Sequence, residues 1–364
     1  MPGADERRVR RTCGYAAATS EEGNDADGKN HKPARSPMDA DQSGIARAVF
    51  MGSPATAVSA LKALAGHPAC RVVGVFTPPD RPVGRSRRPQ PCPVKTAALA
   101  LKLPVFTPEK IRSAEALQQL GDLRPDIAVV CAYGQLFSQA LLELPRLGCY
   151  NLHFSLLPRW RGASPVQAAI LAGDAVTGVT FQRMVLELDA GPSAAETPPI
   201  PIRPDDTAET LSGRLAEAAA ELLAATLPHL LKGLPPLREQ DGAGVTRCRT
   251  LAKEAGAIHW EAETALEVER KVRAFTPWPG CFSFLGQRRL GIARVEIAAP
   301  PAAAAGEASA PGTLGAGGLV PAREGWVRLL EVKPEGKRAM SAAEFLNGMP
   351  GALGALLQPA PPAG

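Results

Sequence analysis

From residue 45 onward, short apolar runs alternate with segments whose apolar residues recur at helical spacing. The runs have the length of buried strands and lie at residues 45–51, 71–76, 105–106, 126–131, 149–153 and 179–184. The amphipathic segments between them predict helices at residues 55–64, 94–101, 111–120 and 137–144. Strands that alternate with helices form parallel sheets covered on both faces. The first half of the chain is therefore predicted to be an α/β domain with a Rossmann-like parallel sheet.

The second half of the chain changes to short β runs. A long amphipathic helix at 207–231 closes the α/β domain, which we place at residues 45–232, and a linker at 233–247 follows. Beyond the linker, β runs at 281–285, 289–297, 312–319 and 326–332 predict a smaller, OB-like β-barrel over residues 248–349. Residues 350–364 are expected to be a flexible tail. Residues 1–44 are polar and charged, so they cannot build a core and are expected to be disordered.

Composition limits the class of protein. The chain has 364 residues, of which 45% are hydrophobic, enough for two domains with their own cores. No run of apolar residues is long enough to span a membrane. The seven cysteines are scattered and lack a C-x-x-C pair, which favours reduced thiols in the cytoplasm over a disulfide framework or a zinc site. The net charge of +5 is compatible with a polyanionic partner.

The segment NLHFSLLPRWRGASPVQ at residues 151–167 carries the strongest candidate chemistry. Side chains alternate along a strand, so Asn151, His153 and Ser155 are expected on one face, at the carboxyl end where open parallel sheets bind ligands. An amide and an imidazole there could bind an oxyanion that develops on an attacked carbonyl group. Asp189, in LELDAGP, could orient His153 or pass a proton. The pattern alone also fits a buried core histidine and an ordinary turn aspartate.

Basic residues gather in three places. The segment TPPDRPVGRSRRPQPCPVK at residues 77–95 could be a solvated loop, but clustered arginines also suit phosphate oxygens. No G-x-G-x-x-G or P-loop motif is present. In the second domain, three cations lie on a predicted helix and two in a pair, and a small barrel with basic edges suits RNA-backbone contact. The basic candidates are Arg81, Arg85, Arg87, Arg88, Lys95, Arg270, Lys271, Arg273, Lys337 and Arg338.

Residues 45–349 resemble the methionyl-tRNA formyltransferase family. The motifs that carry the resemblance occur in order and are FMGSP, VGVFTPPDRPVGR, AYG, NLHFSLLPRWRGASPVQ, DAVTGVTFQRM, LDAGP, RAFTPWPG and KRAMSAAEFLNG. The resemblance implies a catalytic triad of Asn151, His153 and Asp189, 10-formyltetrahydrofolate as co-substrate, no metal, and initiator methionyl-tRNA as acceptor, bound through the basic residues named above. It also implies a folate site at Tyr133, Gly134, Ser155, Leu156, Leu157 and Pro158.

Two positions depart from the family pattern, because Phe154 and Ala190 stand where the family usually has Gly and Thr. Other functions stay open. A glycinamide ribonucleotide formyltransferase shares the triad but normally lacks the second domain, whereas a nucleotide-sugar formyltransferase has a related second domain. A non-catalytic RNA-binding protein would need neither triad nor folate. The arginine-rich insertion and KRAMSAAEFLNG favour the tRNA enzyme, which we expect to be a monomer.

Overall fold

The computed structural model describes residues 45–83, 88–233, 236–301 and 309–361. The expected disordered extension at 1–44 lies outside these residues, as do Arg85 and Arg87. Across the described part of the chain, no helix combines the length and apolarity needed to cross a membrane.

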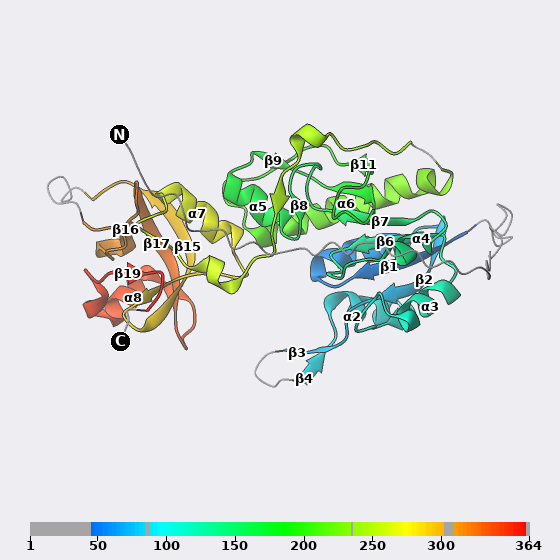
Figure 1. Ribbon diagram of the computed structural model, residues 1–364. Coiled ribbons are helices and arrows are strands. Elements are labelled where there is room, and N and C mark those ends of the chain that lie inside the picture. The colour runs from blue at the N-terminus through cyan, green and yellow to red at the C-terminus, as the bar shows by residue number, and fades with distance from the viewer. Residues whose placement is uncertain (1–44, 84–87, 234–235, 302–308, 362–364) are drawn as a thin grey trace, which may run out of the picture. The chain divides into compact units, whose positions relative to one another are not determined.

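A seven-stranded sheet forms the centre of the first domain (Figure 1). Its order is β11-β10-β7-β6-β1-β2-β5. Five strands are parallel, namely β1 (Ala46–Gly52), β2 (Cys70–Phe76), β5 (Val105–Phe106), β6 (Ile127–Cys131) and β7 (Cys149–His153). The predicted Rossmann-like sheet is thus confirmed. It ends differently from the prediction, because β10 (Thr180–Arg183) runs antiparallel to β7 and forms a hairpin with β11 (Ser193–Glu196).

Helices cover both faces of this sheet. They are α1 (Val58–Ala65), α2 (Pro93–Ala100), α3 (Ala114–Asp122), α4 (Gln139–Glu143), α5 (Pro165–Ala172) and α6 (Ala208–Leu231). A one-turn 3-10 helix, Ala55–Ala57, precedes α1. Successive strand residues enter different cores: Phe50 packs with α1 and α6, whereas Val49 and Met51 pack with Leu120 of α3 and Leu141 of α4. This alternation explains why both faces of the central strands are mostly apolar.

The basic insertion between β2 and α2 contains a hairpin, β3 (Arg81–Val83) with β4 (Arg88–Gln90), which the sequence analysis did not predict. In Figure 1 it extends away from α2. At its base, the Lys95 ammonium group lies 2.7 Å from the Asp80 carboxylate.

The second domain is a curled antiparallel half-barrel, which confirms the predicted class. Its sheet has the order β16-β17-β15-β14-β19, and β18 pairs with β17. The strands are β14 (Cys281–Leu285), β15 (Arg288–Ala298), β16 (Leu319–Pro321), β17 (Trp326–Pro334), β18 (Met340–Ser341) and β19 (Leu357–Gln358). Helices α7 (Ala265–Ala274) and α8 (Ala342–Gly348) accompany this sheet.

Two expectations for this domain were wrong. Most of the segment at residues 312–319 forms turns and a 3-10 helix, Ala316–Gly318, and strand β16 begins only at Leu319. Residues 350–361 are not a flexible tail, because a 3-10 helix, Pro350–Ala352, leads to β19, which pairs with β14. Leu357 of β19 is 2% exposed, so burial of its side chain fixes the end of the chain onto the sheet.

The segment expected to be a linker, 233–247, is hydrogen-bonded to the first domain. Ser193 and Arg238 exchange two backbone hydrogen bonds of 2.8 Å. Further along, β13 (Arg247–Cys248) pairs in parallel with β8 (Arg161–Gly162). The remaining short pair is β9 (Val176–Thr177) with β12 (Ile200–Pro201), and two 3-10 helices, Gly242–Gly244 and Lys253–Gly256, complete the description.

Candidate active site

Strand β7 carries Asn151 and His153 to the carboxyl edge of the sheet. Tyr150 and Leu152 pack into one core and Cys149 into the other, so Asn151 and His153 share the side of Cys149, as the alternation predicts. The expected alternation does not continue to Ser155. The strand ends at His153, and the Ser155 hydroxyl is buried and donates to the Arg159 carbonyl at 2.6 Å. Ser155 therefore stabilises the loop that follows the strand.

The structure brings Asp189 next to His153. His153 Nδ1 lies 3.7 Å from Asp189 Oδ1, and the histidine is only 5% exposed. The other ring nitrogen, Nε2, lies 2.9 Å from the carbonyl oxygen of Trp160. Because a carbonyl oxygen only accepts, Nε2 carries the hydrogen in this contact. The imidazole is thus held between a carbonyl group and a carboxylate.

Two donors fix the Asp189 carboxylate. Gln182 Nε2 donates to Oδ1 and the Gly162 backbone N–H donates to Oδ2, each at 2.9 Å. Asp189 itself has a φ of +53°, in the left-handed region that costs a residue with a Cβ about 1–2 kcal/mol. Strain of this kind persists where surrounding contacts hold the residue, and it often occurs at functional sites.

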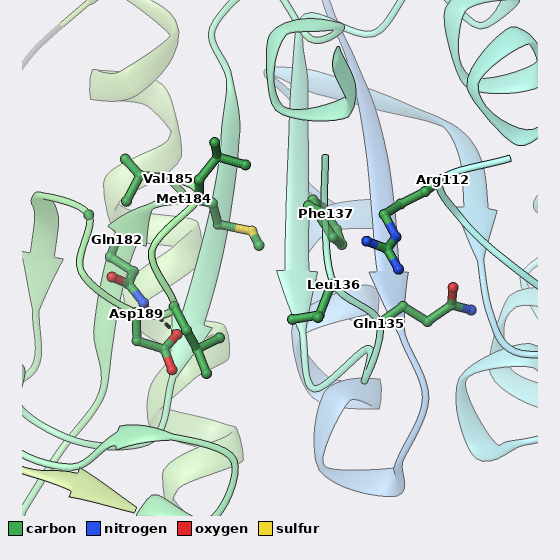
Figure 2. Close-up of a pocket in the computed structure, with 11 residues that line it drawn as sticks. Arg112, Gln135, Leu136, Phe137, Gln182, Met184, Val185 and Asp189 are labelled. Carbon is green, nitrogen blue, oxygen red and sulfur yellow. Dashed lines mark hydrogen bonds between the residues drawn. The ribbon is translucent and has the colours of Figure 1, made fainter. Parts of the chain in front are cut away.

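A pocket opens beside Asp189, whose side chain forms part of its lining (Figure 2). One wall comes from residues 135–137 after β6, and the other from residues 184–191 in the β10–β11 turn. Figure 2 shows Asp189 and Gln182 on one side of the pocket, and Arg112 and Gln135 on the other. Its apolar lining is unusually accessible: the exposed large side chains are Leu136, Val185, Leu186 and Leu188. Exposed apolar clusters mark binding surfaces. The sequence analysis did not identify this cluster, although the segment VLEL at residues 185–188 contains three apolar residues in a turn.

The six residues expected to bind folate are not among the described residues that form the lining of this pocket. Tyr133 is 4% exposed, its hydroxyl is buried without a hydrogen-bond partner, and burial raises its pKa. Gly134, with a φ of +82°, turns the chain toward residues 135–137. Leu157 and Pro158 line a second depression with Ser193, Glu196, Arg238, Glu239, Gln240 and Asp241.

Phe154 packs against the same core as Tyr150 and Leu152. Its ring is therefore directed away from His153, as expected for the next position on an extended segment.

The predicted basic residues have different environments. Arg81 and Arg88 are exposed on the hairpin, and Lys337 and Arg338 are exposed in the turn after β17. Lys95 is engaged with Asp80, as described above.

The α7 cations, which were predicted to contact tRNA, have neighbours within the protein. Lys271 is buried, and its ammonium group donates to the Ala257 carbonyl at 2.6 Å and to Glu263 at 2.5 Å. Arg273 is paired with Glu269 on the same helix, at 2.5 and 3.0 Å. The Arg270 guanidinium lies so close to Gly173 that a Cβ there would be 2.2 Å from it. A buried charge needs partners, and the two partners of Lys271 lie outside α7 and hold the helix in place.

Within residues 45–83, 88–233, 236–301 and 309–361, no group of three or more His, Cys, Asp or Glu side chains could hold a metal ion.

Two family sequence models match the chain: "Formyl transferase" at residues 46–227, and "Formyl transferase, C-terminal domain" at residues 250–350. The chain is therefore a formyltransferase in its domain structure. The methionyl-tRNA formyltransferase of Stenotrophomonas maltophilia is 44% identical over 83% of this chain and 97% of that protein. The methionyl-tRNA formyltransferase of Paracoccus denitrificans is 42% identical over the same shares. The chain belongs to the methionyl-tRNA formyltransferase family.

A solved structure supports the fold independently. The N-formyltransferase from Helicobacter canadensis, in complex with folinic acid and dTDP-3-aminofucose, superposes with a TM-score of 0.57 at 15% identity, covering 78% of this chain and 98% of that chain. At that identity the likeness concerns the fold alone.

Proposed function

We propose that this chain transfers the formyl group of 10-formyltetrahydrofolate to the amino group of methionyl initiator tRNA. The observation that carries this proposal is the His153–Asp189 pair, 3.7 Å apart, with Asp189 in the lining of an apolar pocket and Asn151 on the same strand as His153. The family to which the chain belongs supplies the identity of donor and acceptor.

The reaction forms a bond between the methionyl nitrogen and the formyl carbon, and then breaks the bond between that carbon and the folate nitrogen. The formyl oxygen gains negative charge in between, and the Asn151 amide supplies a donor for it. His153 supplies a second donor from Nδ1 when that nitrogen carries a proton, because the hydrogen on Nε2 is directed at the Trp160 carbonyl. The attacking nitrogen must lose a proton, and the departing folate nitrogen must gain one. Asp189, His153 and water form the proposed relay, and the two hydrogen bonds to Asp189 keep that carboxylate in place throughout.

We place the folate in the pocket between residues 135–137 and residues 184–191. Its apolar walls suit a flat heteroaromatic ring, and its opening beside Asp189 brings the donor to the catalytic pair. Tyr133 and Gly134 are then supports behind the first wall. Ser155, Leu156, Leu157 and Pro158 act through the loop that carries the Trp160 carbonyl.

For the tRNA, we propose contacts with the β3–β4 hairpin and with the turn after β17. Arg81, Arg88, Lys337 and Arg338 are exposed, which suits electrostatic binding of a phosphate backbone. We also propose that the protein acts as a monomer in the cytoplasm, where initiator tRNA is available.

The test is a side-by-side formylation assay. The purified chain is given 10-formyltetrahydrofolate with either charged initiator tRNA or a nucleotide-linked amino sugar. We expect N-formylmethionyl-tRNA and no formylated sugar. Formylation of the sugar alone would instead assign the chain to the nucleotide-sugar formyltransferases. Binding of tRNA without transfer to either acceptor would favour an RNA-binding protein.

A further inference from the structure

The segment that connects the two domains places one side chain, Gln240, against the turn that holds Asp189. Gln240 Nε2 lies 2.9 Å from the Asp189 backbone carbonyl and 2.6 Å from the Gly191 carbonyl. It also lies 3.3 Å from Gln182 Oε1, on the residue that donates to the Asp189 carboxylate. One amide group therefore contacts the catalytic aspartate's backbone and the side chain that supports its carboxylate.

The orientation of the Gln240 amide is settled by its neighbour. Arg161 Nε lies 3.0 Å from Gln240 Oε1, and a guanidinium group can only donate, so the oxygen faces Arg161 and the NH₂ group faces the turn. The NH₂ group has two hydrogens, which match the two short contacts to carbonyl oxygens. Arg161 is itself buried, so this chain of contacts is shielded from solvent.

The same connecting segment also holds the other partner of the histidine. The Trp160 backbone N–H donates to Thr246 Oγ1 at 2.8 Å, and the Arg161 N–H donates to the Thr246 carbonyl at 2.9 Å. The carbonyl group of this same Trp160 is the one that meets His153 Nε2 at 2.9 Å. Gln240 thus holds the turn that carries Asp189, and Thr246 holds the Trp160 backbone. These are the two groups between which the imidazole lies.

We propose that Gln240 and Thr246 are positioning residues of the active site, so that the interdomain segment sets the geometry of the His153–Asp189 pair. The left-handed backbone of Asp189 makes such a tether necessary, because a turn with an unfavourable φ relaxes when its outside contacts are removed. Neither side chain needs to touch substrate. Their contribution is to keep the carboxylate and the imidazole close to each other and in a fixed orientation.

The kinetic test, which rests on the proposed function, is a double-mutant cycle. Gln240→Ala should lower kcat for formylation of charged initiator tRNA at least tenfold, while KM for tRNA stays within about twofold. Glu239→Ala, a neighbouring exposed residue, is the matched control and should leave kcat unchanged. In an Asp189→Ala background, Gln240→Ala should change kcat less than twofold, because the group that it positions is gone. Equal losses in both backgrounds would overturn the proposal.

Thr246 offers a rescue experiment. Thr246→Val keeps the shape but removes the acceptor for Trp160, and should also lower kcat, whereas Thr246→Ser keeps the hydroxyl and should restore most of it. A Thr246→Ser variant as slow as Thr246→Val would indicate a packing role and would count against the assignment.

A readout that does not need activity separates this proposal from the proposed function. The ring nitrogens of His153 can be followed by ¹⁵N NMR, with the resonances assigned by their loss in His153→Gln. Gln240→Ala should shift them, and Glu239→Ala should not. If the parent protein formylates neither acceptor but the shift is seen, the proposed function fails and the positioning role stands. An unshifted His153 signal in Gln240→Ala refutes the positioning role whatever the activity.

Discussion

Replacing Asp189 with asparagine is the sharpest test of the catalytic pair, because it changes the charge and one donor–acceptor relation while keeping the shape. Both carboxylate oxygens accept hydrogen bonds in the native protein, from Gln182 and from the Gly162 backbone. An asparagine has only one oxygen, so its NH₂ group must face one of these donors. A hydrogen bond to a charged group contributes about 1.5–3 kcal/mol. We therefore expect Asp189→Asn to destabilise the protein by about that amount.

The effect on rate follows from the 3.7 Å separation of His153 Nδ1 and Asp189 Oδ1. Two unit charges at that distance interact by about 4–5 kcal/mol at an effective dielectric constant of about 20. Most of this is lost when the carboxylate becomes an amide, so kcat should fall by about 100- to 1000-fold, which corresponds to about 3–4 kcal/mol. KM for the folate donor should change far less, since the apolar walls of the pocket remain.

The assay measures single-turnover formylation of charged initiator tRNA by Asp189→Asn, together with its thermal unfolding. Asp205→Asn makes the same chemical change at an exposed position and serves as the control. His153→Ala should show a rate loss of at least about 100-fold. A folded Asp189→Asn protein with kcat within threefold of the parent would refute the role of the carboxylate and the electrostatic reasoning with it.

Further outcomes follow from other parts of the molecule. Lys271→Ala leaves the partly buried Glu263 carboxylate and a buried carbonyl without this partner. We expect a loss of about 1–3 kcal/mol of stability in a thermal melt, and unchanged stability would contradict the burial of this ion pair. Burial raises the pKa of the Cys131 thiol to about 12, so this thiol should resist a thiol reagent at pH 8 until denaturant is added. Because the thiol ionises more readily in the unfolded chain, it should lower the stability of the fold only as the pH rises above about 9. A chain that begins at Met38 should keep its melting temperature and activity, and a large loss in either would show that the preceding residues act. Replacing Arg85, Arg87 and Arg88 of the basic insertion with alanine should flatten the log–log salt dependence of tRNA binding by up to about 2–3 units. Identical slopes in the two proteins would remove these arginines from the interface.

The elements predicted best are buried strands in which several consecutive residues are apolar. Strand β7 was expected at its observed bounds, and β6 within one residue. Every position of β6 is apolar and buried, whereas β7 also carries Asn151 and His153 at its carboxyl end. The hairpin β3–β4 was missed because it is short and rich in proline and arginine, with no apolar face to produce a period of two.

The candidate site was predictable in part. Strand alternation placed Asn151 and His153 together, but the approach of Asp189 depends on a turn whose path no local pattern specifies. Lys271 shows the opposite failure: its position among other cations suggested a surface, and only the packed helix shows its ion pair with Glu263. Gln240 had no signal at all, since an isolated glutamine in a connecting segment is ordinary.

The hairpin has a consequence for the behaviour of the protein at high concentration. Pro82 stands opposite Pro89 in the pairing of β3 with β4, and neither proline has an N–H group to donate. An extended arm normally offers its unpaired edge to a strand from another molecule, which is a common route to aggregation. Here each strand lacks a donor at its middle residue, and Arg81 and Arg88 add repulsion between copies. The chain can therefore project an arginine-rich arm into solvent without that arm acting as a template for self-association.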